Sequence, residues 1–229
     1  MVISKIIKVH EDNIDSVIDK LKEIKRGKIK FIFYDEDIYI DRIYIPPVKK
    51  AWMDNLISNN LIYNFEDIRK LAFSYEIISK KNSKYKIILY CINSKKNILY
   101  KSIKDKHKIV GVYLIQHCYH YYVKENLKVK DYILVFDSKK YTYIIYSKQG
   151  FLQNSLLYNR DEVEISVVVD SINKILSDHC LTKEGKILPI IMLNYEKTDL
   201  LMELLNDYCF KNMGTVNENK IIRKYVGVF

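Results

Sequence analysis

The spacing of apolar residues along the chain switches repeatedly between alternation and helical periodicity. Residues 1–9 alternate and predict a short strand, whereas 11–27 carry apolar side chains at helical spacing. The next segment, 28–45, predicts two strands joined by a hairpin turn at residues 35–37. The first part of the chain is therefore expected to mix strands and helices.

Two prolines, Pro46 and Pro47, end the second of these strands. Proline has no N–H to donate to a sheet but fits the first turn of a helix. The sequence predicts a helix over 48–60 and then a β-hairpin over 70–93. The elements expected next are a helix over 94–106, a strand over 108–115 and a helix over 116–127.

Beyond residue 128 the order of elements changes to three consecutive short strands, a long helix, a strand and another helix. The expected ranges are 131–137, 140–148, 150–157, 160–178, 186–194 and 196–210, followed by a short terminal strand. The fifth of these is almost continuously apolar, which is typical of a strand covered on both faces. We therefore expect an α/β protein with mixed sheets and two packed lobes, 1–128 and 129–229.

Composition favours a globular protein with a substantial core, because 48% of the 229 residues are hydrophobic and 29% are charged. The net charge of +10 raises the question of an anionic partner. Most of that charge is lysine, whereas residues that read bases and phosphates are more often arginine. The densest basic segments, 80–86 and 101–108, are interpreted as solvated surface. Docking on an anionic membrane or an acidic partner is the alternative.

The cysteines and the apolar runs indicate a cytoplasmic protein. None of the four cysteines forms a CxxC pair, and their apolar or aromatic flanks predict buried free thiols in a reducing compartment. The longest apolar run, 109–115, is too short to span a membrane, and the N-terminus does not read as a signal peptide. Any link to a membrane is expected to be peripheral.

Candidate chemistry is sparse. His117 and His120 share one helix face with Cys118 between them, and with Cys91 or Cys180 they offer zinc ligands. Without a second ligand pair, packing histidines and a buried thiol are the better interpretation.

Two further features invite a functional interpretation. The acidic residues Asp35, Glu36, Asp37 and Asp41 lack the ligand spacing of a calcium loop and are interpreted as a solvated turn. Trp52 is expected in the core, with the lining of a peptide groove as the alternative. The sequence contains no nucleophile-elbow, zinc-protease, phosphate-loop or dinucleotide motif.

The segment DRIYIPP at 41–47, with the helix after it and FSYEII at 73–78, resembles the actin-like PilM and GspL family of type IV pilus and type II secretion machines. The similarity continues through KIILYCIN at 86–93 and the segment at 132–157, which looks like the second hairpin of that family. It covers most of the chain as an order of elements, although the short motifs are degenerate. The strand and helix order after residue 128 is likewise similar to one lobe of an actin-like fold. The resemblance implies a two-lobed, N-terminally shortened actin-like, ribonuclease H-like architecture.

The sequence departs from this family at its nucleotide loops. The chain starts after the place where the first phosphate-binding hairpin of the family would lie. Asp137 matches the aspartate of the second hairpin, but Ser138 and Lys139 follow it, and no glycine lets the backbone close on a phosphate. Residues 193–195 stand where the family has a Gly-Gly turn. The resemblance therefore implies a vestigial nucleotide site at Asp137 with weak or no ATP binding, so we expect no cofactor and a nearly neutral Asp137→Ala substitution.

The function implied by the resemblance is that of a non-enzymatic scaffold at the cytoplasmic face of the inner membrane. Such a protein holds the cytoplasmic tail of a bitopic, PilN-like partner and couples to the assembly ATPase, and its basic surface suits an anionic leaflet. Two alternatives are a basic nucleic-acid-binding protein and a viral α/β protein that binds host factors. The 20 tyrosines can stack on bases, but most lie in strand alternation where they also serve packing, which disfavours nucleic acid.

Overall fold

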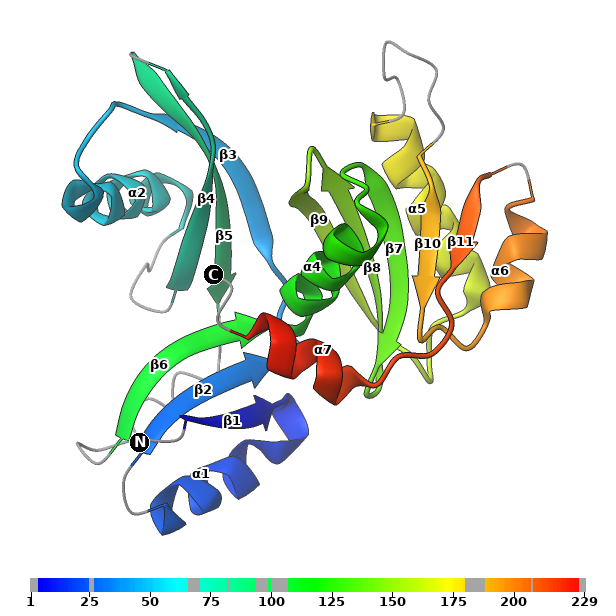
Figure 1. Ribbon diagram of the computed structural model, residues 1–229, viewed down its shortest axis with the longest axis horizontal. Helices are drawn as coiled ribbons and strands as arrows, with labels where there is room; N and C mark the ends of the chain where they lie inside the picture. The colour runs from blue at the N-terminus through cyan, green and yellow to red at the C-terminus, as the bar shows by residue number, and fades with distance from the viewer. Residues whose placement is uncertain are drawn as a thin grey trace. The chain divides into compact units, whose positions relative to one another are not determined.

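The computed structural model describes residues 4–24, 27–65, 71–81, 83–93, 99, 107–179, 188–206 and 208–226 (Figure 1). Its contacts group the chain into two compact units, one of residues 1–35 with 102–229 and the other of 36–101. The predicted boundary near residue 128 does fall between two sheets, but both of those sheets belong to the first unit. The compact units therefore do not follow the predicted division into 1–128 and 129–229.

The first unit begins with a parallel three-stranded sheet in the order β1-β2-β6, formed by β1 (Ser4–Val9), β2 (Gly27–Phe33) and β6 (His107–Leu114). The 3-10 helix η1 (Glu11–Asn13) and α1 (Ile14–Glu23) connect β1 to β2. The amphipathic spacing of α1 buries Val17 and Leu21 against this sheet, while its outer face carries charged residues. The predicted strands and helix are confirmed, and the helix ends earlier than expected.

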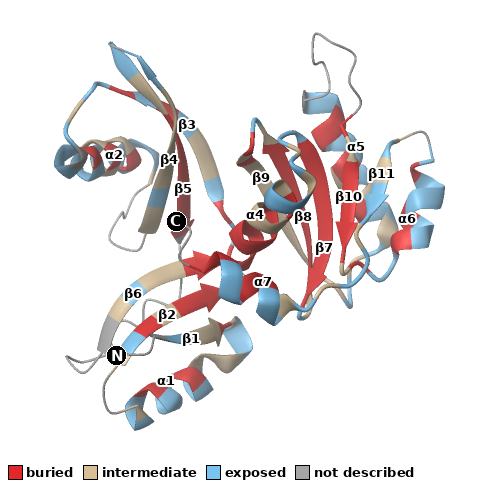
Figure 2. Cartoon of the chain, in the orientation of Figure 1, coloured by how far each residue is buried: buried red, intermediate tan, exposed pale blue. Residues whose placement is uncertain are grey.

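A second, five-stranded sheet of the same unit has the order β11-β10-β7-β8-β9. Its strands are β7 (Tyr132–Ser138), β8 (Tyr141–Lys148), β9 (Phe151–Asn159), β10 (Ile190–Leu193) and β11 (Phe210–Asn212). The three predicted strands β7, β8 and β9 pair as an antiparallel meander, and β10 lies parallel to both β7 and β11. Every residue of β7 and β10 is buried, as Figure 2 shows by their red colour, which confirms that β10 is covered on both faces.

Helices account for the rest of the first unit. They are α4 (Ile115–Leu127), α5 (Ile165–His179), α6 (Thr198–Leu204) and α7 (Glu218–Tyr225). The first three were predicted, although α6 is shorter than the expected helix over 196–210 and β11 begins at residue 210. The expected terminal strand is wrong at 218–225, where the chain forms α7. Its signals are an asparagine cap at Asn217, which accepts a hydrogen bond from Asn219 N, and buried Ile221, Ile222 and Tyr225 at helical spacing.

The second unit contains an antiparallel sheet in the order β3-β5-β4, formed by β3 (Tyr39–Ile45), β4 (Leu71–Lys81) and β5 (Lys84–Asn93). The predicted hairpin of β4 and β5 is confirmed. The predicted hairpin of 28–45 is wrong, because β2 and β3 belong to different sheets and residues 35–37 connect them. This segment is also not a fully solvated turn, since Glu36 is buried.

The helix α2 (Lys50–Asn64) packs on one face of this second sheet and begins after the two prolines. Met53, Ile57 and Leu61 form its buried stripe, together with residues of β3 and β5. Trp52 lies outside this stripe and is 62% exposed, so its expected place in the core is wrong. The helix expected at 94–106 lies mostly outside the described residues.

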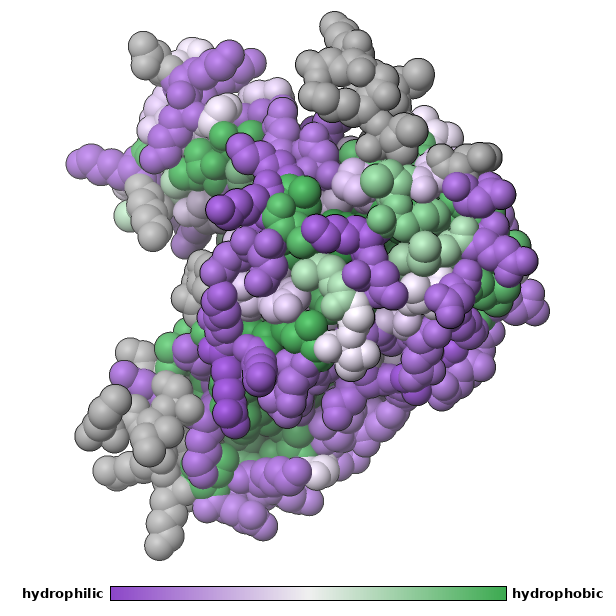
Figure 3. Space-filling model, turned by 45° about the vertical axis from the view of Figure 1, so that its right-hand side comes forward, coloured by the Kyte–Doolittle hydropathy of each residue, from purple (hydrophilic) through white to green (hydrophobic). Residues whose placement is uncertain are grey.

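The surface is in keeping with the composition. The face seen in Figure 3 is mainly hydrophilic, with small separate hydrophobic areas. Among the helices in the described part of the chain, none has the length and apolar character needed to cross a membrane.

Candidate functional site

Four parallel strands of the first unit place polar residues at their carboxyl ends. Lys8 lies near the end of β1, Tyr34 directly follows β2, Ser138 ends β7 and Asn194 follows β10. In open α/β sheets, ligands bind in the crevice beyond the carboxyl ends of the strands. These strand ends are therefore the first place to search for a binding site.

A carboxylate of the chain itself occupies this position. Glu218 is the first residue of α7, and its Oε1 accepts hydrogen bonds from Lys8 Nζ and Tyr34 OH, both at 2.7 Å. Its Oε2 accepts a hydrogen bond from Ser138 Oγ. We call these four residues, Lys8, Tyr34, Ser138 and Glu218, the strand-end cluster. The three groups that donate to Glu218 lie at the ends of three different strands, β1, β2 and β7. The contacts of Glu218 therefore connect the two sheets of the first unit to α7.

The electrostatics of the cluster favour a charged Glu218. Burial raises the pKa of this carboxyl, but the hydrogen bonds from Lys8, Ser138 and Tyr34 and the positive charge of Lys8 outweigh it, so the pKa lies below its usual value. Its place in the first turn of α7 adds to this, because the positive end of the helix dipole stabilises a carboxylate. The negative charge of Glu218 at the strand ends is therefore balanced by the positive charge of Lys8 in the same chain.

Aromatic rings fill the space beside the cluster. The rings of Tyr119 and Phe136 stack with centroids 4.0 Å apart, and Phe136 stacks on Tyr143 at 4.6 Å. All three side chains are fully buried, and Tyr143 OH donates a hydrogen bond to the carbonyl oxygen of Tyr34. Buried stacked rings pack as densely as the rest of a protein interior. The three rings are therefore a tightly packed part of the core next to Tyr34.

Asp137, the predicted vestige of a nucleotide site, lies next to the cluster but binds other parts of the chain. Its Oδ1 accepts a hydrogen bond from Thr142 Oγ1 at 2.7 Å, and its Oδ2 accepts one from the backbone N–H of Glu196 at 3.1 Å. The carboxyl is 7% exposed, and burial raises its pKa despite these two hydrogen bonds. Both oxygens of Asp137 therefore have partners that hold the β7–β8 turn and the chain after β10 in place.

The β7–β8 turn and the residue after β10 have a left-handed backbone conformation. Lys139, in the β7–β8 turn, has φ 58°, and Asn194 has φ 54°. Such left-handed conformations cost a lysine about 1 kcal/mol but are adopted more readily by asparagine. The Asn194 side chain accepts a hydrogen bond from Val216 N and donates to Tyr119 OH at 3.0 Å. The hydrogen bond with Val216 connects the segment before α7 to the end of β10.

A salt bridge joins the β7–β8 turn to the segment after β1. Lys140 Nζ lies 2.5 Å from Asp12 Oδ2. The pair is exposed, and exposed ion pairs contribute little to stability. It does, however, connect the same two sheets that Glu218 connects.

The predicted zinc ligands are explained by packing. His120 is fully buried, with Nε2 at 3.2 Å from the carbonyl oxygen of Gly150 and Nδ1 at 2.7 Å from Tyr132 OH. A carbonyl only accepts, so Nε2 carries the proton and Nδ1 accepts from the tyrosine. Burial lowers the pKa of His117 to about 4 and that of His120 to about 3. Both histidines are therefore neutral at pH 7.

The other candidate ligands do not join this group. Cys118 is buried, and burial raises the pKa of its thiol to about 12. Cys91 is buried in the second unit, Cys180 lies outside the described residues, and Cys209 is exposed, contrary to the expectation of a buried thiol. Among the described residues, no group of three or more His, Cys, Asp or Glu side chains is placed to hold a metal ion.

Comparison with known proteins relates this arrangement to solved structures. No protein-family model and no curated protein sequence matches the chain. A PilM-PilN type IV pilus biogenesis complex matches with a TM-score of 0.62 and 6% identity, over 92% of this chain and 76% of that one. A Bacteroides thetaiotaomicron protein of unknown function with an actin-like ATPase fold matches with a TM-score of 0.55 and 11% identity, over 93% and 80%.

The chain has an actin-like fold. This confirms the architecture and the structural resemblance inferred from the sequence. The cytoplasmic domain of EpsL, an inner-membrane component of the Vibrio cholerae type II secretion system, is also similar, with a TM-score of 0.49 and 8% identity, over 92% of this chain and 79% of that one. At these identities the comparisons establish the fold, and the function is argued below.

The sequence singled out Asp137 but missed Glu218 and its three donors. Lys8, Tyr34 and Ser138 lie in ordinary strand patterns, and no short motif marks them. Asparagine is a common N-terminal cap of helices, and apolar residues follow Asn217 at helical spacing. This local signal could have predicted α7 and, with it, the position of Glu218 at its start. The contact between α7 and the strand ends spans about the whole length of the chain, and no local pattern predicts such a contact.

Proposed function

We propose that this protein is a non-enzymatic scaffold in the assembly platform of a type IV pilus or type II secretion machine. In this role it binds the cytoplasmic tail of a bitopic, PilN-like inner-membrane protein and couples it to the assembly ATPase. The observation that carries the proposal is the shared fold with a PilM-PilN complex over 92% of the chain. Its place is the cytoplasmic side of the membrane, with its excess of positive charge next to anionic lipid.

The strand-end cluster supports the non-enzymatic part of the proposal. Binding ATP there would bring phosphate charges next to the Glu218 carboxylate, which already takes the hydrogen bonds of Lys8, Tyr34 and Ser138. Repulsion between like charges in a partly buried site costs several kcal/mol unless the carboxylate moves away. The protein is therefore proposed to work without a nucleotide cofactor and without turnover.

The proposal is tested with the cytoplasmic tails of single-span membrane proteins encoded beside this chain in its genome. Each tail is synthesised as a peptide and titrated into the full protein by calorimetry, with a scrambled peptide as the control. We expect one tail to bind with micromolar affinity and the scrambled peptide to give no heat. Absence of binding by every tail, or phosphate release from ATP above the buffer blank, would contradict the proposal.

A further inference from the structure

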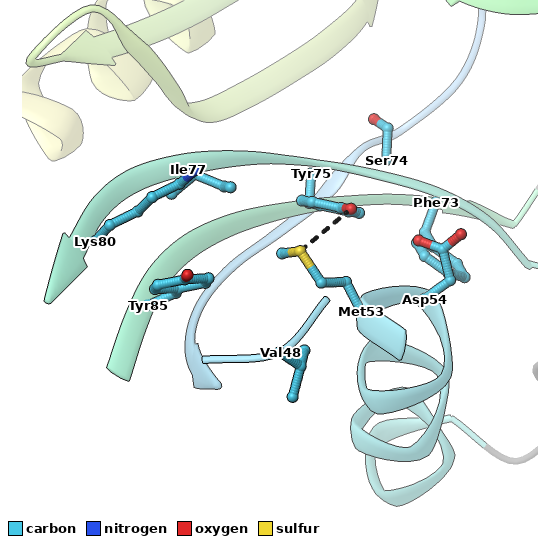
Figure 4. A pocket seen from close by; sticks show the side chains of 9 residues that line it. All are labelled: Val48, Met53, Asp54, Phe73, Ser74, Tyr75, Ile77, Lys80 and Tyr85. Carbon is cyan, nitrogen blue, oxygen red and sulfur yellow. Dashed lines mark hydrogen bonds between the residues drawn. The ribbon is translucent and has the colours of Figure 1, made fainter. Parts of the chain in front are cut away.

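The second unit contains a groove that its own core does not fill. The helix α2 packs mainly over β3 and β5, so the side chains of β4 on the same face remain only partly buried. Phe73, Tyr75 and Ile77 of β4 line a cavity of about 630 Å³, with Met53 of α2 opposite. Figure 4 shows Tyr75 reaching toward Met53, where its OH lies 3.7 Å from the sulfur. We call this cavity the β4 groove.

The charges of the groove lie at its two ends. Asp54 and Phe73 are at one end and Lys80 and Tyr85 at the other, while apolar side chains lie between them (Figure 4). At the Lys80 end, Lys80 Nζ lies 5.7 Å from the ring centre of Tyr85, whereas Lys84 and Lys86 contact Tyr44 on the opposite face of the sheet. An occupant of this groove is thus apolar in its middle and acidic where it meets Lys80.

The backbone of β4 favours an extended peptide as the occupant. In the described part of the second unit, β4 is an edge strand that pairs with β5 along one side. It is 11 residues long, and between Leu71 and Ser79 its only charged residue is Glu76. Natural edge strands are usually short or protected by charges, because an unprotected edge pairs with other chains. Recognition by strand addition combines such an edge with pockets for alternate side chains.

We infer that the β4 groove binds an extended peptide segment that adds to the edge of β4, places alternate apolar side chains against Tyr75 and Ile77, and meets Lys80 with an acidic residue. At about 3.4 Å per residue, the span from Phe73 to Lys80 fits a segment of roughly seven or eight residues. This inference rests on the proposed function and locates the tail of the membrane partner. It also gives Lys80, the one lysine of the basic segment 80–86 that lines the groove, an acidic partner, in line with the alternative left open by the sequence.

The direct test uses two fluorescent peptides of alternating valine and threonine, one ending in two glutamates and the other in two lysines. Fluorescence anisotropy with the full protein is expected to show at least tenfold tighter binding of the acidic peptide. Lys80→Glu, on an exposed side chain, is expected to remove this preference, and Ile77→Asp to remove binding. Trp52→Ala, on an exposed side chain of α2 that does not line the groove, is the matched control and leaves both affinities unchanged. Equal binding of the two peptides, or no effect of Lys80→Glu, would overturn the inference.

The partner tail separates this inference from the proposed function. Binding of a membrane-protein tail that Lys80→Glu and Ile77→Asp do not weaken would overturn the β4 groove and leave the scaffold proposal standing. Binding of the acidic peptide in the groove without binding of any tail would support the groove and contradict the scaffold. Self-association lost in both variants, with neither peptide bound, would assign the groove to a second copy of this chain and overturn the peptide inference.

Discussion

The strand-end cluster and the β4 groove differ in what fills them. At the strand ends, Glu218 satisfies a lysine, a tyrosine and a serine, and the rings beside them are fully buried. In the β4 groove, half-buried aromatic side chains face a cavity of about 630 Å³. A site that the chain completes by itself contributes to stability, whereas a site left open is available to a partner. The first region is therefore expected to be sensitive in unfolding experiments and the second in binding experiments.

Removal of Glu218 is expected to have the largest effect on stability. Glu218→Ala leaves Lys8 without its ion pair and Tyr34 and Ser138 without their acceptor, at a cost of about 3 kcal/mol. Urea denaturation measures the loss. Asp19→Ala is the control, because the ion pair of Asp19 with Lys22 is exposed and its loss is expected to change stability little. Equal losses in the two variants would show that the strand-end cluster has no special role.

Substitution of Asp137 is expected to have the next largest effect. The sequence alone predicted a nearly neutral Asp137→Ala, but the hydrogen bonds from Thr142 and from Glu196 N revise this prediction. The buried hydroxyl of Thr142 and the backbone N–H of Glu196 lose their acceptor, so we expect a loss of about 2 kcal/mol. Asp137→Asn keeps one side-chain oxygen as an acceptor and is expected to lose less. Thermal unfolding of both variants provides the comparison, and an unchanged Tm for Asp137→Ala would restore the earlier prediction.

The buried histidines make stability depend on pH. Their pKa values in the folded state lie at about 4 for His117 and about 3 for His120, below 6.5. Between pH 6.5 and those values the unfolded chain binds protons that the folded chain does not, so stability falls as the pH falls. From pH 7 to 5.5 each histidine is expected to cost about 1 kcal/mol.

His120→Gln separates this effect from that of other groups. It removes the titration of His120 and is expected to reduce the loss between pH 7 and 5.5 by about 1 kcal/mol, whatever its effect on absolute stability. Glu218 does not contribute in this range, because its pKa is lowered and its stabilising effect is lost only in more acidic solution. The same pH dependence in the variant and the parent protein would show that His120 is not the titrating group.

The smallest expected effect is that of Trp52. Since its side chain is 62% exposed, Trp52→Ala is expected to leave the free energy of unfolding nearly unchanged. Met53→Ala, one residue further along α2, removes a buried side chain and is expected to cost about 3 kcal/mol. Denaturant titration of the two variants checks which side of α2 packs on the sheet. A large loss for Trp52→Ala would contradict the assignment.

Most of the elements could be predicted because their signals are local. The meander of β7, β8 and β9 follows from alternation, and the fully apolar β10 follows from burial on both faces. The error at 35–37 has a physical reason. Two alternating segments separated by a short acidic stretch resemble a hairpin, and only the pairing of β2 with β1 and β6 shows that they belong to different sheets.

The candidate site was harder to predict than the fold. Trp52 was placed in the core because large aromatics usually are buried, yet Met53 takes the stripe that faces the sheet. Asp137 was found through a family resemblance, but its partners depend on the folding of Thr142 and Glu196 around it. The contact of Glu218 with Lys8 joins residues 210 positions apart, and the pattern around either residue contains no sign of it.

The claim that the chain itself fills its strand-end site is tested most directly by titration calorimetry of the full protein with ATP and Mg²⁺ up to millimolar concentration. We predict no saturable heat, because Glu218 holds the donors that a phosphate would need. Tight, saturable binding by the unaltered protein, weakened by Asp137→Asn, would contradict the claim and place a working nucleotide site beside Asp137.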